Sequence, residues 1–252
     1  MPTFTTDTNG PITLDLDAPV ADVTIRTRPE LATATVQVTG PKEVVSNVTE
    51  YMAAGRWTVR VPAPGPTVIT GSNGGARNMV VGSITGGSVV VAGGNVTVSG
   101  STVISGGNTL TTTEPVHLLL TLPEGSNVRL SQNTGGARLD GHYGEVDFRS
   151  SNASLDLVGG AERVEADTSN GDLTVAGTVT EEIDVSATNG TLTLASSAPR
   201  TRARATNGSV TVTASGPHRI RARTTNGSLT VLKNGHDADV TSSTTNGSEL
   251  VR

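Results

Sequence analysis

Residues 183–212 read IDVSATNGTLTLASSAPRTRARATNGSVTV, and this stretch contains the pattern that decides the fold. A Thr-Asn-Gly turn sits between two alternating segments, and the same unit returns 18 residues later. Counting every turn of this kind, the anchor residues are Asn152, Asn170, Asn189, Asn207, Asn226 and Asn246. Five of the six are followed by Gly, and Thr134-Gly135 fits the same register one repeat earlier. Successive anchors lie 18–20 residues apart, and such fixed self-similarity predicts a repeat architecture.

Two alternating segments flank each anchor. Before it, apolar or small residues stand at positions −6, −4 and −2, as in Ile183, Val185 and Ala187. After it, apolar residues stand at +3 and +5, as in Leu192 and Leu194. Alternation with period two indicates a strand with one buried face. Each repeat is therefore expected to hold two short strands joined at Asn-Gly, a pair that tolerates positive φ.

Two arrangements of these strands are possible. Each repeat could fold into an Asn-Gly hairpin, or it could form one coil of a stack whose equivalent strands pair in parallel. The near-constant spacing favours the stack, because every coil must have the same circumference. We therefore predict an all-β fold, a single-stranded β-solenoid (β-helix) with about 18–19 residues per coil.

The anchor asparagines are expected to have a structural role. Stacked coils lie about 4.8 Å apart, so the side-chain amides of one column can hydrogen-bond from coil to coil. We expect a structural ladder along the turn from these six residues rather than a ligand site.

Residues 1–62 are predicted to form an N-terminal cap of β-strands and one short helix. Asn9-Gly10 repeats the anchor pattern, which would place Ile12 and Leu14 at positions +3 and +5.

The helix of this cap is expected between Pro41 and Gly55, residues that suit a first turn and a helix exit. Its apolar face would consist of Val44, Val45, Val48, Tyr51 and Met52. Such a helix would cover the open edge of the solenoid, which otherwise exposes unpaired strand groups.

Residues 63–114 form an insertion rich in Gly, Val and Thr, and no charged residue occurs from Asn78 to Thr113. This segment could be a flexible Gly-rich loop. It could also be a set of strands that must be covered, in which case it would pack in a contact between copies. Residues 115–252 are expected to be the regular coils, and all three parts to form one continuous domain.

Composition excludes several classes of protein. The 252 residues carry a formal charge of −5, no Cys and only 2% aromatic residues. Disulfides and thiolate metal sites are therefore excluded, and the thin core of a solenoid explains the scarcity of aromatic residues. No secretory signal and no apolar run of membrane-spanning length is present, so we expect a cytoplasmic protein.

Outward positions −5 and −3 should form columns of charge along one side of the solenoid. The expected acidic residues are Asp147, Glu165, Asp167 and Asp184. The expected basic residues are Arg202, Arg204, Arg221 and Arg223. These columns could be a solvated face in which Arg149 meets Asp167 and Asp184 meets Arg202, each pair adding at most about 1 kcal/mol. They could instead be an interface, where the acidic patch of one molecule meets the basic patch of another.

Catalysis has weak support in the sequence. Two stacked carboxylates could form a glycosidase pair, but the face lacks the aromatic platforms of a saccharide cleft. The four His residues show no metal-ligand spacing, and neither a phosphate-binding loop nor a nucleophile elbow is present. The net negative charge and missing aromatics argue against nucleic-acid binding. Outward Thr and Ser columns on the other strands also occur in ice-binding solenoids.

Several segments together resemble a known family. They are Asn9-Gly10-Pro11-Ile12-Thr13-Leu14, Val23-Thr24-Ile25, Trp57-Thr58-Val59, Leu120-Thr121-Leu122-Pro123-Glu124-Gly125 and the Thr-Asn-Gly coils. The chain resembles the "putative adhesin" β-strand repeat family, a domain of unknown function, over most of its length outside residues 66–113. This resemblance implies a β-solenoid without known catalysis.

We therefore predict a non-enzymatic structural or interaction protein that self-associates as a scaffold. The expected partner is a second copy of the chain or another protein, with no nucleic acid, no membrane span, no metal and no cofactor. The alternatives are an adhesin-like module that binds a surface or a polysaccharide and, more remotely, a carbohydrate-active β-helix enzyme.

Overall fold

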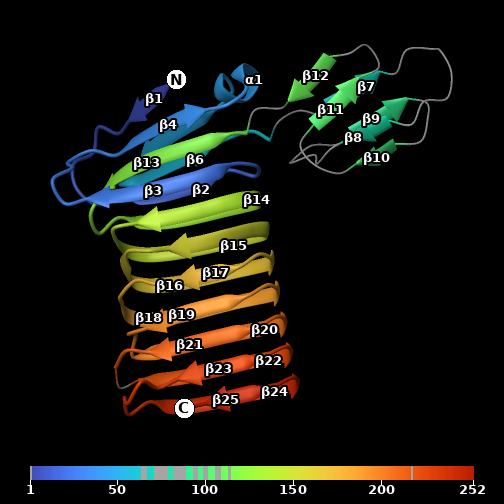
Figure 1. The fold of residues 1–252 in the computed structure, drawn as a ribbon. Helices are drawn as coiled ribbons and strands as arrows, with labels where there is room; N and C mark the ends of the chain where they lie inside the picture. Colours follow the sequence, from blue (N-terminus) through green and yellow to red (C-terminus); the bar gives the residue numbers. More distant parts are fainter. Residues whose placement is uncertain are drawn as a thin grey trace.

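The computed structural model describes residues 2–63, 115–216 and 218–252, together with the backbone of six strands between Thr67 and Thr112. The described chain is a β-solenoid, as predicted, with strands stacked in parallel along one long axis (Figure 1). The N-terminus and the C-terminus lie at opposite ends of the stack.

The first side of the solenoid carries the strands that precede each anchor. In spatial order they are β5 (Thr49–Ala53), β6 (Arg56–Arg60), β2 (Thr13–Asp17), β14 (Asn127–Asp140), β15 (His142–Leu157), β16 (Gly160–Asn170), β18 (Val179–Asn189), β20 (Arg200–Asn207), β22 (Arg219–Asn226) and β24 (Asp239–Asn246). All neighbours pair in parallel except β5 and β6, which form an antiparallel hairpin.

The second side carries the strands that follow each anchor. In spatial order they are β1 (Thr3–Thr5), β4 (Thr35–Thr39), β13 (His117–Pro123), β3 (Asp22–Arg28), the later parts of β14 and β15, β17 (Leu173–Val175), β19 (Leu192–Ser196), β21 (Val210–Ala214), β23 (Leu229–Leu232) and β25 (Glu249–Val251). Strands β14 and β15 run around the anchor corner and so belong to both sides.

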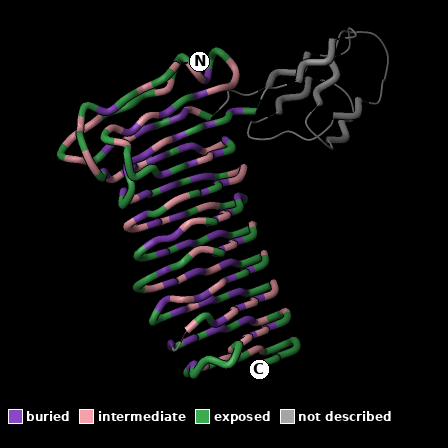
Figure 2. The backbone as a smooth tube through the Cα atoms, turned by 60° about the vertical axis from the view of Figure 1, so that its left-hand side comes forward, coloured by how far each residue is buried: buried purple, intermediate pink, exposed green. Residues whose placement is uncertain are grey.

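The core lies between the two sides and follows the predicted alternation. Inward residues such as Val146, Ile183 and Leu192 are at most 1% exposed, and buried and exposed residues alternate along each rung (Figure 2). Phe148 and Tyr143 are buried aromatic residues within the coils, and Trp57 is buried in the cap. The last coil is more open, because all three residues of β25 are exposed.

The order of coils along the stack differs from their order in the chain. Strand β13 pairs with both β3 and β4, and β2 lies between β6 and β14. The coil made by β2 and β3 is thus enclosed by strands that come later in the sequence. Residues 1–62 therefore supply a complete coil as well as the antiparallel strands at the N-terminal end.

The anchor predicted at Asn9 is wrong. Leu14 pairs with Val128, a residue at position −6, and Val20 forms the bridge to Thr134 at the anchor position. Ile12 and Leu14 therefore belong to the first side of the solenoid and not to positions +3 and +5. Alternating apolar residues look alike on both sides, so the sequence pattern alone could not distinguish them.

The short helix predicted between Pro41 and Gly55 is present, but its predicted extent is wrong. Helix α1 covers only Lys42–Val45, a single turn. The following residues form β5, in which Tyr51 is 68% exposed, and Ala54 and Gly55 have positive φ in the turn to β6. Hydrogen bonding of β5 to β6 decides the structure of this segment. The N-terminal end is covered by the antiparallel strands as well as by α1.

Within residues 67–112 the backbone of six strands is described. They are β7 (Thr67–Thr70), β8 (Met79–Val81), β9 (Val89–Ala92), β10 (Val96–Val98), β11 (Thr102–Ser105) and β12 (Thr109–Thr112). They pair two by two, β7 with β9, β8 with β10 and β11 with β12. The contact between copies expected for the uncharged segment 78–113 depends on side chains outside the described residues. In the described residues, no helix is long and apolar enough to span a lipid bilayer.

Candidate interaction face

The outward residues of the first side form two charge columns along the stack. We call the outward side chains of β15, β16, β18, β20, β22 and β24 the charged face. Position −5 runs through Asp147, Glu165, Asp184, Arg202, Arg221 and Thr241. Position −3 runs through Arg149, Asp167, Ser186, Arg204, Arg223 and Ser243. In both columns each residue is the Cα partner of the next, so the acidic and basic patches are continuous surfaces.

Ion pairs neutralise part of the acidic patch. Arg149 contacts Asp147 at 3.1 Å and Glu165 at 3.7 Å, although its Cα partner is Asp167. The carboxylate of Asp167 instead accepts a hydrogen bond from the Ser186 hydroxyl. The pair expected between Arg149 and Asp167 is therefore replaced by one contact along the same strand, to Asp147, and one diagonal contact to the next strand, to Glu165.

At the centre of the face, the carboxylate of Asp184 forms ion pairs with two guanidinium groups. Asp184 contacts Arg202 at 3.5 Å and Arg204 at 3.1 Å, and Arg202 also lies 3.7 Å from Glu182. The expected pair of Asp184 with Arg202 is present. Glu182 was not among the predicted residues, because it lies at position −7, outside the two columns considered, where its Cα partners are Arg163 and Arg200.

The basic patch retains free charge. Within residues 2–63, 115–216 and 218–252, no carboxylate lies within ion-pair distance of Arg221 or Arg223. Both side chains are exposed, and their neighbours on the next strand, Thr241 and Ser243, are neutral. The face thus has an acidic end with partial compensation and a basic end with excess positive charge.

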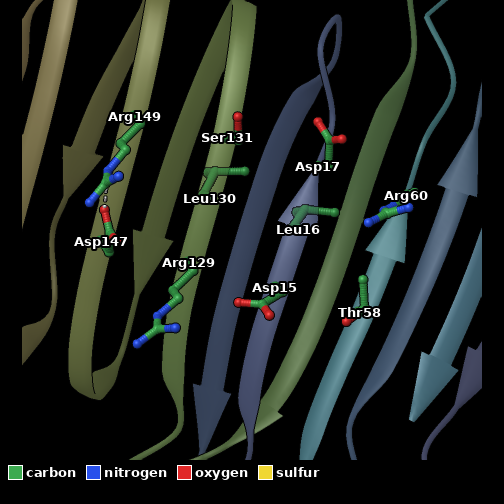
Figure 3. A pocket seen from close by; sticks show the side chains of 10 residues that line it. All are labelled: Asp15, Leu16, Asp17, Thr58, Arg60, Arg129, Leu130, Ser131, Asp147 and Arg149. Carbon is green, nitrogen blue, oxygen red and sulfur yellow. Dashed lines mark hydrogen bonds and ion pairs between the residues drawn. The ribbon is translucent and has the colours of Figure 1, made fainter. Parts of the chain in front are cut away.

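A shallow hollow lies beside the charged face, toward the N-terminal end (Figure 3). Its volume is about 350 Å³. It is lined by side chains of both charge signs, which are Asp15, Asp17, Arg60, Arg129, Asp147 and Arg149. Arg149 and Asp147 point toward one another. In the described part of the chain, no group of three or more His, Asp and Glu residues could hold a metal ion.

The second side is different in character. From β17 onward its outward residues lack charge and form columns of hydroxyl groups, such as Thr174, Thr193, Thr211 and Thr230. From β17 onward, the two sides of the solenoid therefore present a charged surface and a neutral surface, whereas the earlier strands of the second side carry charges such as Arg138 and Asp156.

An asparagine ladder runs along the corner between the two sides. Each side-chain amide donates to Oδ1 of the asparagine one coil earlier, at distances of 2.7–2.9 Å. The chain of bonds connects Asn152, Asn170, Asn189, Asn207, Asn226 and Asn246. The ladder holds the corners in register, and its residues are exposed.

The glycine that follows the anchor has a second physical basis besides the predicted one. Positive φ occurs at Gly190 (159°) and Gly227 (149°), but not at Gly171, Gly208 and Gly247. A Cβ at Gly208 would lie 1.9 Å from the carbonyl oxygen of Gly190, one coil earlier. Close backbone approach between coils therefore requires glycine at each of these five positions, and positive φ adds to the requirement at two of them.

Two ionisable groups outside the charged face have shifted pKa values. Burial raises the pKa of Tyr143, whose hydroxyl donates to the carbonyl of Ile25 at 2.8 Å. Burial, with a smaller contribution from His236, lowers the pKa of His218. Tyr143 lies at the bend before the first side, where its hydrogen bond ties two coils together.

Replacing Asn189 with Ala should lower the free energy of unfolding by about 1–3 kcal/mol, since two side-chain hydrogen bonds are lost at about 0.5–1.5 kcal/mol each. Urea denaturation followed by circular dichroism measures the change. Asn9→Ala is the control, because this exposed side chain lies outside the ladder. Equal effects of the two substitutions would show that the ladder does not stabilise the coils.

Comparison with known proteins supports the architecture. No protein-family model matches the chain, and no curated protein matches its sequence. A solved structure from Bacteroides fragilis, described as a "putative adhesin", is 11% identical, with a TM-score of 0.51 and coverage of 99% of this chain and 96% of the other. A second "putative adhesin", from Parabacteroides merdae, is 13% identical, with a TM-score of 0.48 and coverage of 100% and 96%. At these identities the similarity is one of fold, and the chain is similar in fold to the Bacteroides fragilis protein.

Proposed function

We propose that this protein is a non-enzymatic interaction scaffold that associates with copies of itself. The observation that carries the proposal is the charged face, where an acidic patch and a basic patch with free charge occupy one continuous surface. Because each patch lacks a full set of partners among the described residues of its own chain, a second copy can supply the missing charges of both. We also propose membership of the "putative adhesin" β-strand repeat family, which the fold similarity supports.

Self-association through charged groups should depend on salt. The Debye length falls from about 30 Å at 0.01 M to about 3 Å at 1 M ionic strength, so exposed ion pairs between copies weaken strongly. We expect sedimentation velocity at micromolar concentration to show dimers or larger species at low salt and monomers at high salt. A monomer at both salt concentrations would refute self-association.

A second candidate is an adhesin-like module that binds a surface or a polysaccharide. The neutral part of the second side, from β17 onward, favours it, because columns of Thr and Ser hydroxyls offer regularly spaced hydrogen-bonding groups. The description of the Bacteroides fragilis neighbour as a "putative adhesin" points the same way. Binding to a glycan array that is lost on replacing Thr193 and Thr211 with Val would support this function over the scaffold.

A further inference from the structure

From β16 to β22, the charges at positions −5 and −3 are arranged antisymmetrically about the middle of the face. Between β18 and β20 both columns change sign. At position −5, Glu165 and Asp184 precede this point, and Arg202 and Arg221 follow it. At position −3, Asp167 and Ser186 precede it, and Arg204 and Arg223 follow it. A two-fold rotation about the middle of the face therefore places acidic positions on basic positions, and basic positions on acidic ones.

From this pattern we propose that two copies pack charged face to charged face as an antiparallel, two-fold symmetric dimer. The symmetry axis runs parallel to the strands and passes between β18 and β20. This inference rests on the proposed function, since it specifies how the self-association takes place. It places β16 of one copy opposite β22 of the other, and β18 opposite β20.

The two-fold axis fixes which residues meet. Rotation about an axis parallel to the strands reverses the stacking direction and keeps each column opposite its own kind. Glu165 then faces Arg221 of the second copy, and Asp167 faces Arg223 of the second copy. Because the interface is isologous, each contact occurs twice. The guanidinium groups of Arg221 and Arg223 thereby receive the carboxylates that residues 2–63, 115–216 and 218–252 of their own chain do not provide.

Alternative arrangements leave charges unpaired. A two-fold axis along the stack would place β16 opposite β16, and so carboxylates opposite carboxylates. A copy displaced along the stack would engage one patch and leave the other exposed. Of these arrangements, the antiparallel one brings both patches of both copies into contact at positions −5 and −3. At position −7 it places Arg163 opposite Arg219, and each of these already has a carboxylate partner in its own chain.

The size of the face indicates a weak dimer. Six strands at about 4.8 Å spacing and five residues at about 3.3 Å per residue give a projected area of about 480 Å² per copy. This area lies below that of a standard stable interface, at about 800 Å² per partner. We therefore expect rapid exchange between monomer and dimer, which makes mixing experiments practicable.

Two charge-reversal variants test the arrangement. In the first, Glu165→Arg and Asp167→Arg make both ends of the face basic. In the second, Arg221→Glu and Arg223→Glu make both ends acidic. Each variant alone should be a monomer at low salt in sedimentation velocity, with an unchanged circular dichroism spectrum. An equimolar mixture should recover a species of dimer mass, because an acidic end then meets a basic end at both sites.

The control carries the same charge change as the second variant, two Arg→Glu substitutions, on another surface. Arg26→Glu combined with Arg28→Glu alters exposed residues of β3 on the second side, and its self-association should equal that of the unmodified protein. If the unmodified protein associates but the mixture of variants stays monomeric, the antiparallel arrangement is wrong and self-association stands. If either variant alone associates as the unmodified protein does, the arrangement is likewise wrong. A monomeric unmodified protein would overturn both proposals.

Discussion

Replacing Phe148 with Ala is expected to lower the free energy of unfolding by about 3–5 kcal/mol, the usual cost of truncating a buried Phe. Phe148 is 0% exposed and lies between Leu130 and Ala166 on the neighbouring strands. Leu130 and Ala166 are fixed by the hydrogen bonds of the parallel stack, so they cannot move into the space that the ring leaves. Urea denaturation followed by circular dichroism should give a lower midpoint at an unchanged slope.

Phe4→Ala is the matched control for this prediction. It removes the same ring from the short strand β1, where Phe4 is only partly buried against the core. Its effect should be less than half that of Phe148→Ala, because part of the ring is already in water and the surrounding strand lies at the end of the stack. Similar losses for both variants would show that the thin core closes around missing side chains.

Replacing Gly177 with Ala should destabilise the solenoid by at least about 3 kcal/mol, the upper end of the usual cost of overpacking. A Cβ at Gly177 would lie 1.1 Å from the carbonyl oxygen of Gly159, one coil earlier. The obstacle is backbone and not a side chain that could rotate away, so the two coils must separate locally. Thermal denaturation and the yield of folded protein measure the effect.

Gly216→Ala is the control, since it adds the same methyl group at the corresponding bend of a later coil. The nearest atom to a Cβ at Gly216 is Nδ1 of His218 at 3.9 Å, an ordinary contact. Its stability should stay within about 0.5 kcal/mol of the unmodified protein, as for most surface substitutions. A Gly177→Ala variant as stable as this control would contradict the close approach of the coils.

The repeat made the architecture predictable because one spacing constrains every coil. Residues 18–20 apart must lie over one another when the circumference is constant, and Asn189 does pair with Asn207. The N-terminal part has no such internal check. There, Asn9-Gly10 matches the anchor pattern without being an anchor. The segment that contains Tyr51 has the apolar spacing of a helix, but it forms a strand because it hydrogen-bonds with β6.

For the candidate site, the sequence predicted which residues share a column, but it did not predict which side chains contact one another. Which residues share a column follows from the spacing alone, so Glu165 and Arg221 could be assigned to one outward surface. Which charges remain free depends on how far each side chain reaches. Arg149 pairs with Asp167 in the backbone register, but its side chain contacts Glu165. This contact depends on the side-chain rotamer, which the sequence pattern does not predict.

By itself the sequence determined the coil length, the alternation of buried and outward residues, and the sign of the charge at each outward position. These properties follow from chain periodicity, which is local and repeats. Only the tertiary structure decided that the coil of β2 and β3 lies between later strands. It also decided that backbone contact requires the glycine column. Finally, it decided that Arg221 and Arg223 have no carboxylate partner in the described chain. Each of these depends on distances between residues far apart in the sequence, and those distances are fixed only when the coils stack.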